Sequence, residues 1–179
     1  MRRYLALCLL LTSSLLHAEL VETDWLELLP AADLAAMEQM AEINHDGPES
    51  DGTFTNKNGL KQQDKNLPAV MYSSNTVTAL NGTDLRIGGY PVPLEQDAEG
   101  NSTLFFLVPY PGACIHVPPP PPNQIILVRY PKGIALEDIY NPIWVSGTLH
   151  IEPVNNDLAE AAYALDASNV RWVEEADLD

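Results

Sequence analysis

The fold class rests on residues 77–87, which read V-T-A-L-N-G-T-D-L-R-I. Asn81 and Gly82 separate two runs of residues that favour β-strands. Both central positions of a type I′ turn need positive φ, which Asn and Gly tolerate better than other residues. The stretch therefore predicts a β-hairpin in which residues 77–80 pair with residues 85–87.

Short extended runs continue around this hairpin and are separated by turn residues about every eight to twelve positions. They lie at residues 70–80, 90–94, 103–108, 124–129, 143–151 and 164–173. Gly88 and Gly89 predict a sharp bend, and residues 157–162 predict a short helical turn before the last run. The pattern predicts a mainly β protein with a small closed barrel of the oligonucleotide/oligosaccharide-binding (OB) type, with an open sandwich as the alternative.

The N-terminal region contains two predicted helical pieces. Residues 24–27, D-W-L-E, form a variant of the capping box that opens a short helix, and Pro30 suits the first turn of a second helix. In the second helix Leu34, Met37 and Ala41 recur at helical spacing. We therefore expect an N-terminal amphipathic helix packed on the barrel.

The first eighteen residues have the pattern of an export signal. The basic start M-R-R is followed by an apolar run from Tyr4 to Leu11 and by L-H-A, which ends at Ala18 with a small residue. The apolar stretch is shorter than the roughly 20 residues that a membrane-spanning helix needs. We expect cleavage after Ala18, periplasmic localisation and no stable membrane insertion afterwards, with lipidation at Cys8 as the alternative.

The remaining chain divides into four parts by composition. Residues 19–43 form the helical segment, residues 44–67 a polar linker, residues 68–173 the barrel domain and residues 174–179 an acidic tail. The 179 residues suffice for one domain of ordinary size. With 9 Lys and Arg against 25 Asp and Glu, the formal net charge is −16. Such a charge repels phosphate groups, so nucleic acids and anionic lipids are excluded as partners.

Cys114 and His116 lie in the most unusual segment, residues 108–124, which read V-P-Y-P-G-A-C-I-H-V-P-P-P-P-P-N-Q. In an extended backbone, residues two apart face the same side, so the thiol and the imidazole can reach one small ion or each other. Prolines 118–122 predict a stiff polyproline II rod of roughly 15 Å. Gly112 allows a sharp turn just before the cysteine.

Three interpretations of Cys114 and His116 remain open. A thiolate and a neutral imidazole suit zinc or copper, and His150 is a candidate third ligand. Alternatively, His116 draws the proton from Cys114 and the pair works as a thiol catalyst. In the third interpretation Cys114 is a small buried core residue beside a hydrogen-bonded His116.

The proline rod from Pro118 to Pro122 has two interpretations of its own. Rods of this kind dock in aromatic-lined grooves of other proteins, which would make the segment a protein-docking module. Alternatively, aromatic side chains of the same chain cover the rod. The candidates are Tyr90, Tyr110, Tyr130 and Trp144. Packing within the chain is favoured, because tyrosines are common near the run.

The same segment carries a family resemblance. Two further stretches share it, L-R-I-G-G-Y-P-V-P-L-E at residues 85–95 and P-I-W-V-S-G-T-L at residues 142–149. With the core V-P-Y-x-G-A-C-I-H-V-P-P-P-P-P-N-Q, they resemble an uncharacterised family of exported proteobacterial proteins, a domain of unknown function. Similar members stand beside ABC-transporter components and in zinc-responsive gene sets. The resemblance implies a periplasmic accessory role in transport or metal handling and brings no catalytic activity.

We therefore expect a non-enzymatic periplasmic protein whose partner is an ABC-transporter component or another periplasmic protein. In this hypothesis zinc or copper contacts Cys114 and His116, and His150 is the third ligand. A thiol-dependent enzyme and a docking module built on the proline rod are the rival functions.

Overall fold

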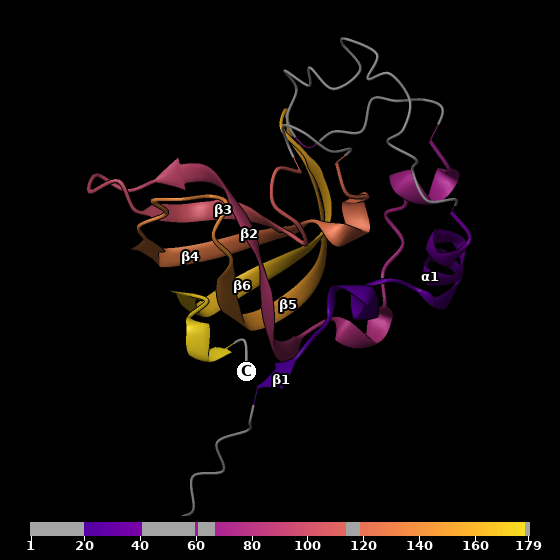
Figure 1. Ribbon diagram of the computed structural model, residues 1–179, viewed down its shortest axis with the longest axis horizontal. Helices are drawn as coiled ribbons and strands as arrows, with labels where there is room; N and C mark the ends of the chain where they lie inside the picture. The colour runs from indigo at the N-terminus through magenta and orange to yellow at the C-terminus, as the bar shows by residue number, and fades with distance from the viewer. Residues whose placement is uncertain (1–19, 41–59, 61–66, 114–118, 178–179) are drawn as a thin grey trace, which may run out of the picture.

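Buried and partly exposed residues alternate along residues 85–92, as expected for a β-strand with one face toward the core. The computed structural model describes residues 20–40, 60, 67–113 and 119–177 (Figure 1). Its strands are β1 (Val21–Glu22), β2 (Thr83–Gln96), β3 (Ser102–Val108), β4 (Ile126–Ile134), β5 (Ile143–Asn155) and β6 (Glu160–Trp172). Its helical elements are the α-helix α1 (Ala31–Glu38) and the short 3-10 helices η1 (Trp25–Leu28), η2 (Ala69–Tyr72), η3 (Thr78–Leu80), η4 (Pro122–Gln124) and η5 (Glu175–Asp177).

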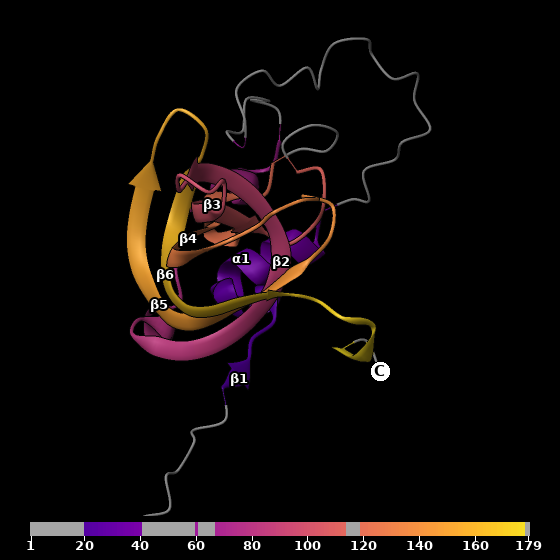
Figure 2. The ribbon, with the colours of Figure 1, turned by 90° about the vertical axis from the view of Figure 1, so that its left-hand side faces the viewer.

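Within these described residues, five strands close into a barrel in the order β2-β3-β4-β6-β5, and β5 pairs back onto β2 (Figure 2). Neighbouring strands are antiparallel except β4 and β6, which are parallel. This order is that of the five-stranded Greek-key OB barrel. The prediction of a mainly β, OB-like closed barrel with an N-terminal helix is confirmed.

Closure depends on a change of partner halfway along β2. Residues 83–89 of β2 pair with β5, and residues 90–96 pair with β3. Gly88 and Gly89 stand at the change, where the predicted bend lies. A Cβ atom on Gly89 would lie 2.8 Å from the carbonyl oxygen of Val108 and 2.9 Å from Cγ of Leu107. Glycine is therefore required at position 89, because a side chain there would collide with the end of β3 at the point where β2 starts to pair with it.

The buried apolar side chains of the described residues fall into two clusters. The interior of the barrel holds the larger cluster, which includes Leu85, Phe105, Val128 and Tyr163. The second cluster lies on the opposite face of β3, β4 and β6, where alternate residues such as Phe106 point. These three strands are thus buried on both faces, which explains their nearly continuous apolar sequences.

The predicted hairpin at residues 77–87 is wrong. Residues 78–80 form the 3-10 helix η3, and Asn81 has φ −67° and ψ 121° while Gly82 has φ +78°. These angles define a type II turn, whose geometry does not match the twist of two paired strands. The backbone N–H of Val77 donates instead to the hydroxyl of Tyr163 at 2.7 Å. The first predicted strand region, residues 70–80, is therefore not a strand.

A second correction concerns residues 157–162, where a helical turn was predicted. Strand β6 begins at Glu160, inside this range. Oδ1 of Asn156 accepts the backbone N–H groups of Leu158 and Ala159, each at 2.9 Å. The polar residues of this stretch therefore form a side-chain-capped turn between β5 and β6 and not a helix.

The N-terminal helical segment lies at one end of the barrel (Figures 1 and 2). The capping box is present, because Asp24 accepts the N–H of Leu26 at 2.8 Å and Glu27 accepts the N–H of Asp24 at 3.0 Å. Leu28 of η1 is fully buried in the interior cluster. Helix α1 packs against η2, and among its own residues only Asp33 is fully buried. No helix among the described residues has the length and apolar character to cross a membrane.

We predict that Gly89→Ala destabilises the protein by about 2–3 kcal/mol, because the added methyl group meets backbone that cannot move without breaking the β2–β3 pairing. Gly88→Ala is the matched control. Its Cβ would lie 3.0 Å from the Trp144 ring, which can shift, so we expect a cost of about 1 kcal/mol. Urea denaturation of both variants measures the difference, and equal costs would contradict the role given to Gly89.

Candidate functional site

Cys114 and His116 lie outside the described residues, so the structure neither joins nor separates them. Both belong to the long connection between β3 and β4, and the described residues on either side of them are buried. Ala113, just before Cys114, has 1 % of its surface exposed and packs in the second cluster. Gly112 has φ +73°, so the predicted turn before the cysteine is present. The connection is thus fixed to the barrel immediately before the motif.

The prolines that follow the motif are also held in the protein. Residues 119–122 are all buried, and Pro121 has the polyproline II angles φ −62° and ψ 156°. Packing of the rod within the chain is confirmed for these residues, and the docking alternative is wrong for them. The aromatic candidate Trp144 does not cover the rod, because its ring lies against Gly88 and Arg86 of β2.

The outer face of β3 and β4 is covered by the chain itself. Phe106 and Val108 of β3 and Leu127 of β4 have at most 7 % of their surfaces exposed. They cluster with Ala113 from the β3–β4 connection and with Leu60, whose backbone N–H donates to the carbonyl of Leu158 at 2.7 Å. OB barrels bind oligonucleotides and oligosaccharides on this face. In this protein the face is part of the hydrophobic core.

Tyr110 also belongs to this covered face. It lies in the β3–β4 connection and packs against the second cluster. Burial raises the pKa of its hydroxyl to about 12, since the ionised form would lose its hydration. The connection therefore contributes both an apolar group, Ala113, and a partly buried hydroxyl, that of Tyr110, to its contact with the barrel.

A buried polar clasp fixes the end of the proline rod. The Asp33 carboxylate accepts hydrogen bonds from the hydroxyl of Ser73 at 2.5 Å, from Nδ2 of Asn123 at 2.8 Å and from Nδ2 of Asn75 at 3.3 Å. Asn123 is completely buried, and its amide also donates to the carbonyl of Asn75 at 3.0 Å. The clasp joins helix α1, the segment after η2 and helix η4. Sequence reasoning missed it, because an isolated Asp in a helix gives no sign of distant partners.

A second polar contact fixes the same region to the barrel. The buried hydroxyl of Tyr163 on β6 donates to the carbonyl of Leu28 at 2.9 Å and accepts the N–H of Val77. Burial raises the pKa of this hydroxyl. Nε2 of Gln124 donates to the carbonyl of Trp25 at 2.8 Å. Helices η1 and η4 are therefore hydrogen-bonded to each other, and η1 is also hydrogen-bonded to Tyr163 near the start of β6.

His150, the predicted third ligand, lies on β5 with its side chain 37 % exposed. Its Nε2 atom is 3.3 Å from Oδ2 of Asp166 on β6. Arg129 lies 3.4 Å from the same carboxylate and also binds Glu152 closely. Among the described residues, no three His, Cys, Asp or Glu side chains are arranged to hold a metal ion. A metal centre at His150 would therefore need ligands from outside the described residues, where Cys114 and His116 lie.

The chain is similar to known proteins in sequence and in fold. A family model described as "Protein of unknown function (DUF3299)" matches residues 25–172. The chain belongs to the DUF3299 family. It is also similar to the crystal structure of a DUF3299 family protein from Pseudomonas aeruginosa PAO1, with 37 % sequence identity and a TM-score of 0.64 over 87 % of this chain and 97 % of that chain. No curated protein matches the chain. The match to DUF3299 starts at Trp25 and so includes the helical segment as well as the barrel.

We predict that Asp33→Ala lowers the free energy of unfolding of this DUF3299 protein by about 3 kcal/mol, because it removes the acceptor of the buried Asn123 amide and of the half-buried Ser73 hydroxyl. Glu38→Gln is the control, since Glu38 is exposed on the same helix and its loss should cost less than about 0.5 kcal/mol. Urea denaturation measures both values. A cost for Asp33→Ala no larger than the control would show that the clasp does not hold η4.

Proposed function

We propose that this DUF3299 protein is exported to the periplasm and is a non-enzymatic accessory of a metal-handling or transport system. Zinc or copper is the proposed cargo, and Cys114 and His116 are the proposed ligands. The observation that carries the proposal is the anchoring of their segment: buried residues of the barrel domain hold it on both sides, at Ala113 and at Pro119.

Anchoring matters because metal affinity depends on how well ligands are held before the ion arrives. Five residues separate Ala113 from Pro119. The polar clasp and η4 fix the far end of the proline rod, so the residues on both sides of this short segment belong to the folded barrel domain. A thiolate and an imidazole two residues apart then satisfy part of the coordination that zinc or copper requires.

His150 is proposed as a third ligand through Nδ1. Metal-binding histidines commonly donate their second ring N–H to a carboxylate, which fixes the orientation of the ring. Nε2 of His150 faces Asp166 in this way, which leaves Nδ1 for the ion. Asp166 is itself oriented by Arg129.

Two further observations support binding of a metal cation over binding of nucleic acid. The covered outer face of β3 and β4 removes the surface that OB barrels use for oligonucleotides. The net charge of −16 repels phosphate groups and attracts cations. An ABC-transporter component or another periplasmic protein is the proposed partner, on the basis of the family resemblance.

Metal analysis of the untagged, exported protein tests the proposal. With micromolar zinc or copper supplied, we expect about one equivalent of metal in the natural protein and a loss of most of it in Cys114→Ala and in His116→Ala. His150→Ala should weaken binding about 10- to 100-fold if Nδ1 is a ligand. Lys132→Ala, on the exposed part of β4, is the control and should retain the metal. No bound metal in the natural protein would overturn the proposal.

The rival function, a thiol-dependent enzyme, makes a different prediction for Cys114. A catalytic cysteine beside His116 would be largely thiolate at neutral pH and would react rapidly with iodoacetamide. We expect slow alkylation in the metal-loaded protein and faster alkylation after chelation, because the ion shields the sulfur atom. Rapid alkylation that metal does not change would favour the enzyme.

A further inference from the structure

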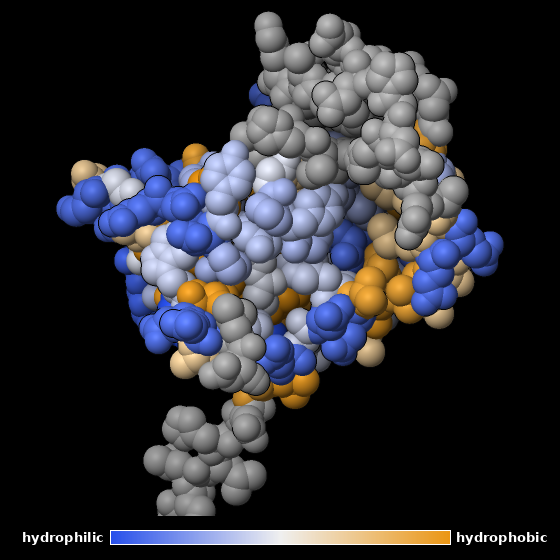
Figure 3. Space-filling view, in the orientation of Figure 1, coloured by the Kyte–Doolittle hydropathy of each residue, from blue (hydrophilic) through white to orange (hydrophobic). Residues whose placement is uncertain are grey.

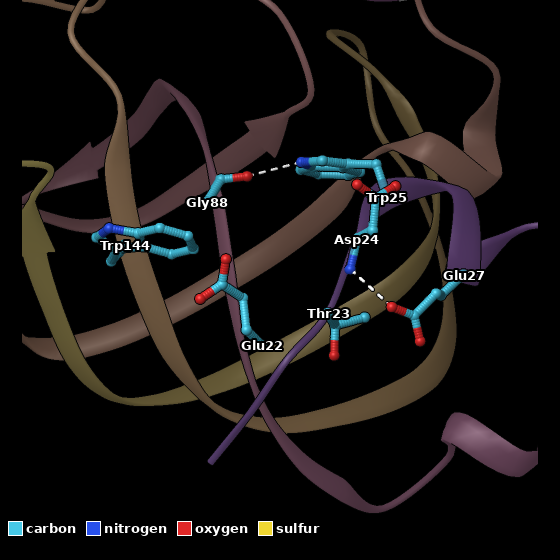
Figure 4. Close-up of a pocket in the computed structure, with 7 residues that line it drawn as sticks. All are labelled: Glu22, Thr23, Asp24, Trp25, Glu27, Gly88 and Trp144. Atoms are coloured by element: carbon cyan, nitrogen blue, oxygen red, sulfur yellow. Dashed lines mark hydrogen bonds between the residues drawn. The ribbon is translucent and has the colours of Figure 1, made fainter. Parts of the chain in front are cut away.

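A pocket of about 340 Å³ opens where β1 and the start of η1 run beside β2 (Figure 4). Its volume suits a single side chain or a small ligand. Figure 4 shows the indole rings of Trp25 and Trp144 on either side of Gly88, with the Glu22 carboxylate between them. The pocket is lined by Glu22, Thr23, Asp24, Trp25, Glu27, Gly88 and Trp144.

Contacts with β2 position both aromatic walls of the pocket. Nε1 of Trp25 donates to the carbonyl of Gly88 at 2.7 Å, which fixes this ring. The Trp144 ring packs against Gly88, so close that a Cβ atom there would be 3.0 Å from it. Fixing the Trp25 ring before binding reduces the conformational entropy that is lost when a ligand enters.

The polar lining of the pocket is negatively charged. The carboxylates of Asp24 and Glu27 both take part in the capping box, where they accept only backbone N–H groups among the contacts of the described residues and so keep their full negative charge. Glu22 pairs with Arg86 at 2.6 Å. Three carboxylates therefore line the pocket and, in the described part of the chain, only that of Glu22 is paired with an arginine, Arg86, so the site favours a further cation.

The chain itself shows which cation suits this surface. The guanidinium carbon of Arg86 lies 4.5 Å from the centre of the Trp144 ring, while its Nη2 atom binds Glu22. Arg86 thus combines a cation–π contact with a carboxylate pair at the rim of the pocket. Trp25, Asp24 and Glu27 offer the same combination of groups on the other side.

We propose that this pocket binds an arginine side chain from an extended, basic segment of a partner protein. A planar guanidinium can stack on an indole and donate to carboxylates at once. Apolar residues beside the pocket favour a protein segment over a free ion: Leu20, Val21 and Leu26 have 42 %, 66 % and 55 % of their surfaces exposed. Figure 3 shows apolar surface around β1 and beside the helical segment. The site does not involve Cys114 or His116 and is independent of the proposed metal.

Tryptophan fluorescence tests this inference, because two of the three tryptophans of the chain line the pocket. Trp172→Phe removes the third signal and serves as the background for every measurement. The probe is the peptide acetyl-Gly-Val-Arg-Val-Gly-amide, and its comparison is the same peptide with Gln in place of Arg. We expect saturable binding of the arginine peptide and at least about tenfold weaker binding of the glutamine peptide. Free acetyl-arginine-amide should bind more weakly than the arginine peptide, and equal affinities would overturn the assignment to a protein segment.

A matched pair of variants separates the pocket from general electrostatics. Glu22→Gln/Asp24→Asn/Glu27→Gln removes the three charges and keeps the capping groups, since Asn also caps helices. Glu95→Gln/Glu99→Gln/Glu137→Gln changes the net charge equally at exposed positions outside the pocket. We expect about tenfold weaker binding for the first variant and a change within about twofold for the second. Equal losses in both variants, or no saturable binding by the natural pocket, would overturn the inference, whereas the metal content tests the proposed function separately.

Discussion

The backbone pairing of β2 is the constraint on which the rest of the structure depends. Its first half pairs with β5 and its second half with β3, so β2 closes the barrel and leaves one edge of its first half unpaired by β3. The N-terminal segment covers part of that edge: β1 pairs with Leu85 and Arg86, Thr23 donates to the carbonyl of Arg86, and Trp25 donates to the carbonyl of Gly88. The same strand therefore closes the barrel and holds the N-terminal segment, which pairs with backbone groups of β2 that closure leaves without a partner.

Because the outer face of β3 and β4 is covered, the surface that OB barrels usually use for ligands is not accessible in this protein. The β3–β4 connection contributes Ala113 and Tyr110 to this cover, and Leu60 adds to it. Burial of these residues gives the connection a fixed base, which is why its Cys-x-His motif is proposed as a metal site. The tryptophan pocket lies elsewhere, where the N-terminal segment meets β2, so the two proposed sites depend on different parts of the fold.

The sequence was sufficient to predict a feature whose physical cause lies within a few neighbouring residues. The capping box at residues 24–27 needs only neighbouring side chains, and the structure contains it as predicted. The hairpin at residues 77–87 was predicted wrongly for the opposite reason. Asn-Gly suits both type I′ and type II turns, and Tyr163, far along the chain, takes the N–H that pairing would have used.

By itself, the sequence determined that this protein is a small, mainly β barrel of the OB type, because alternating apolar runs and turn residues act over short distances. It also singled out Cys114 and His116, since residues two apart in an extended chain share a side. Only the tertiary structure decided that Asp33 is a buried acceptor, that residues 119–122 of the proline rod are buried, and that Trp25 and Trp144 line one pocket. Each of these three features joins segments that are distant in sequence. Closure of the barrel brings such segments together, and no local sequence pattern predicts those contacts.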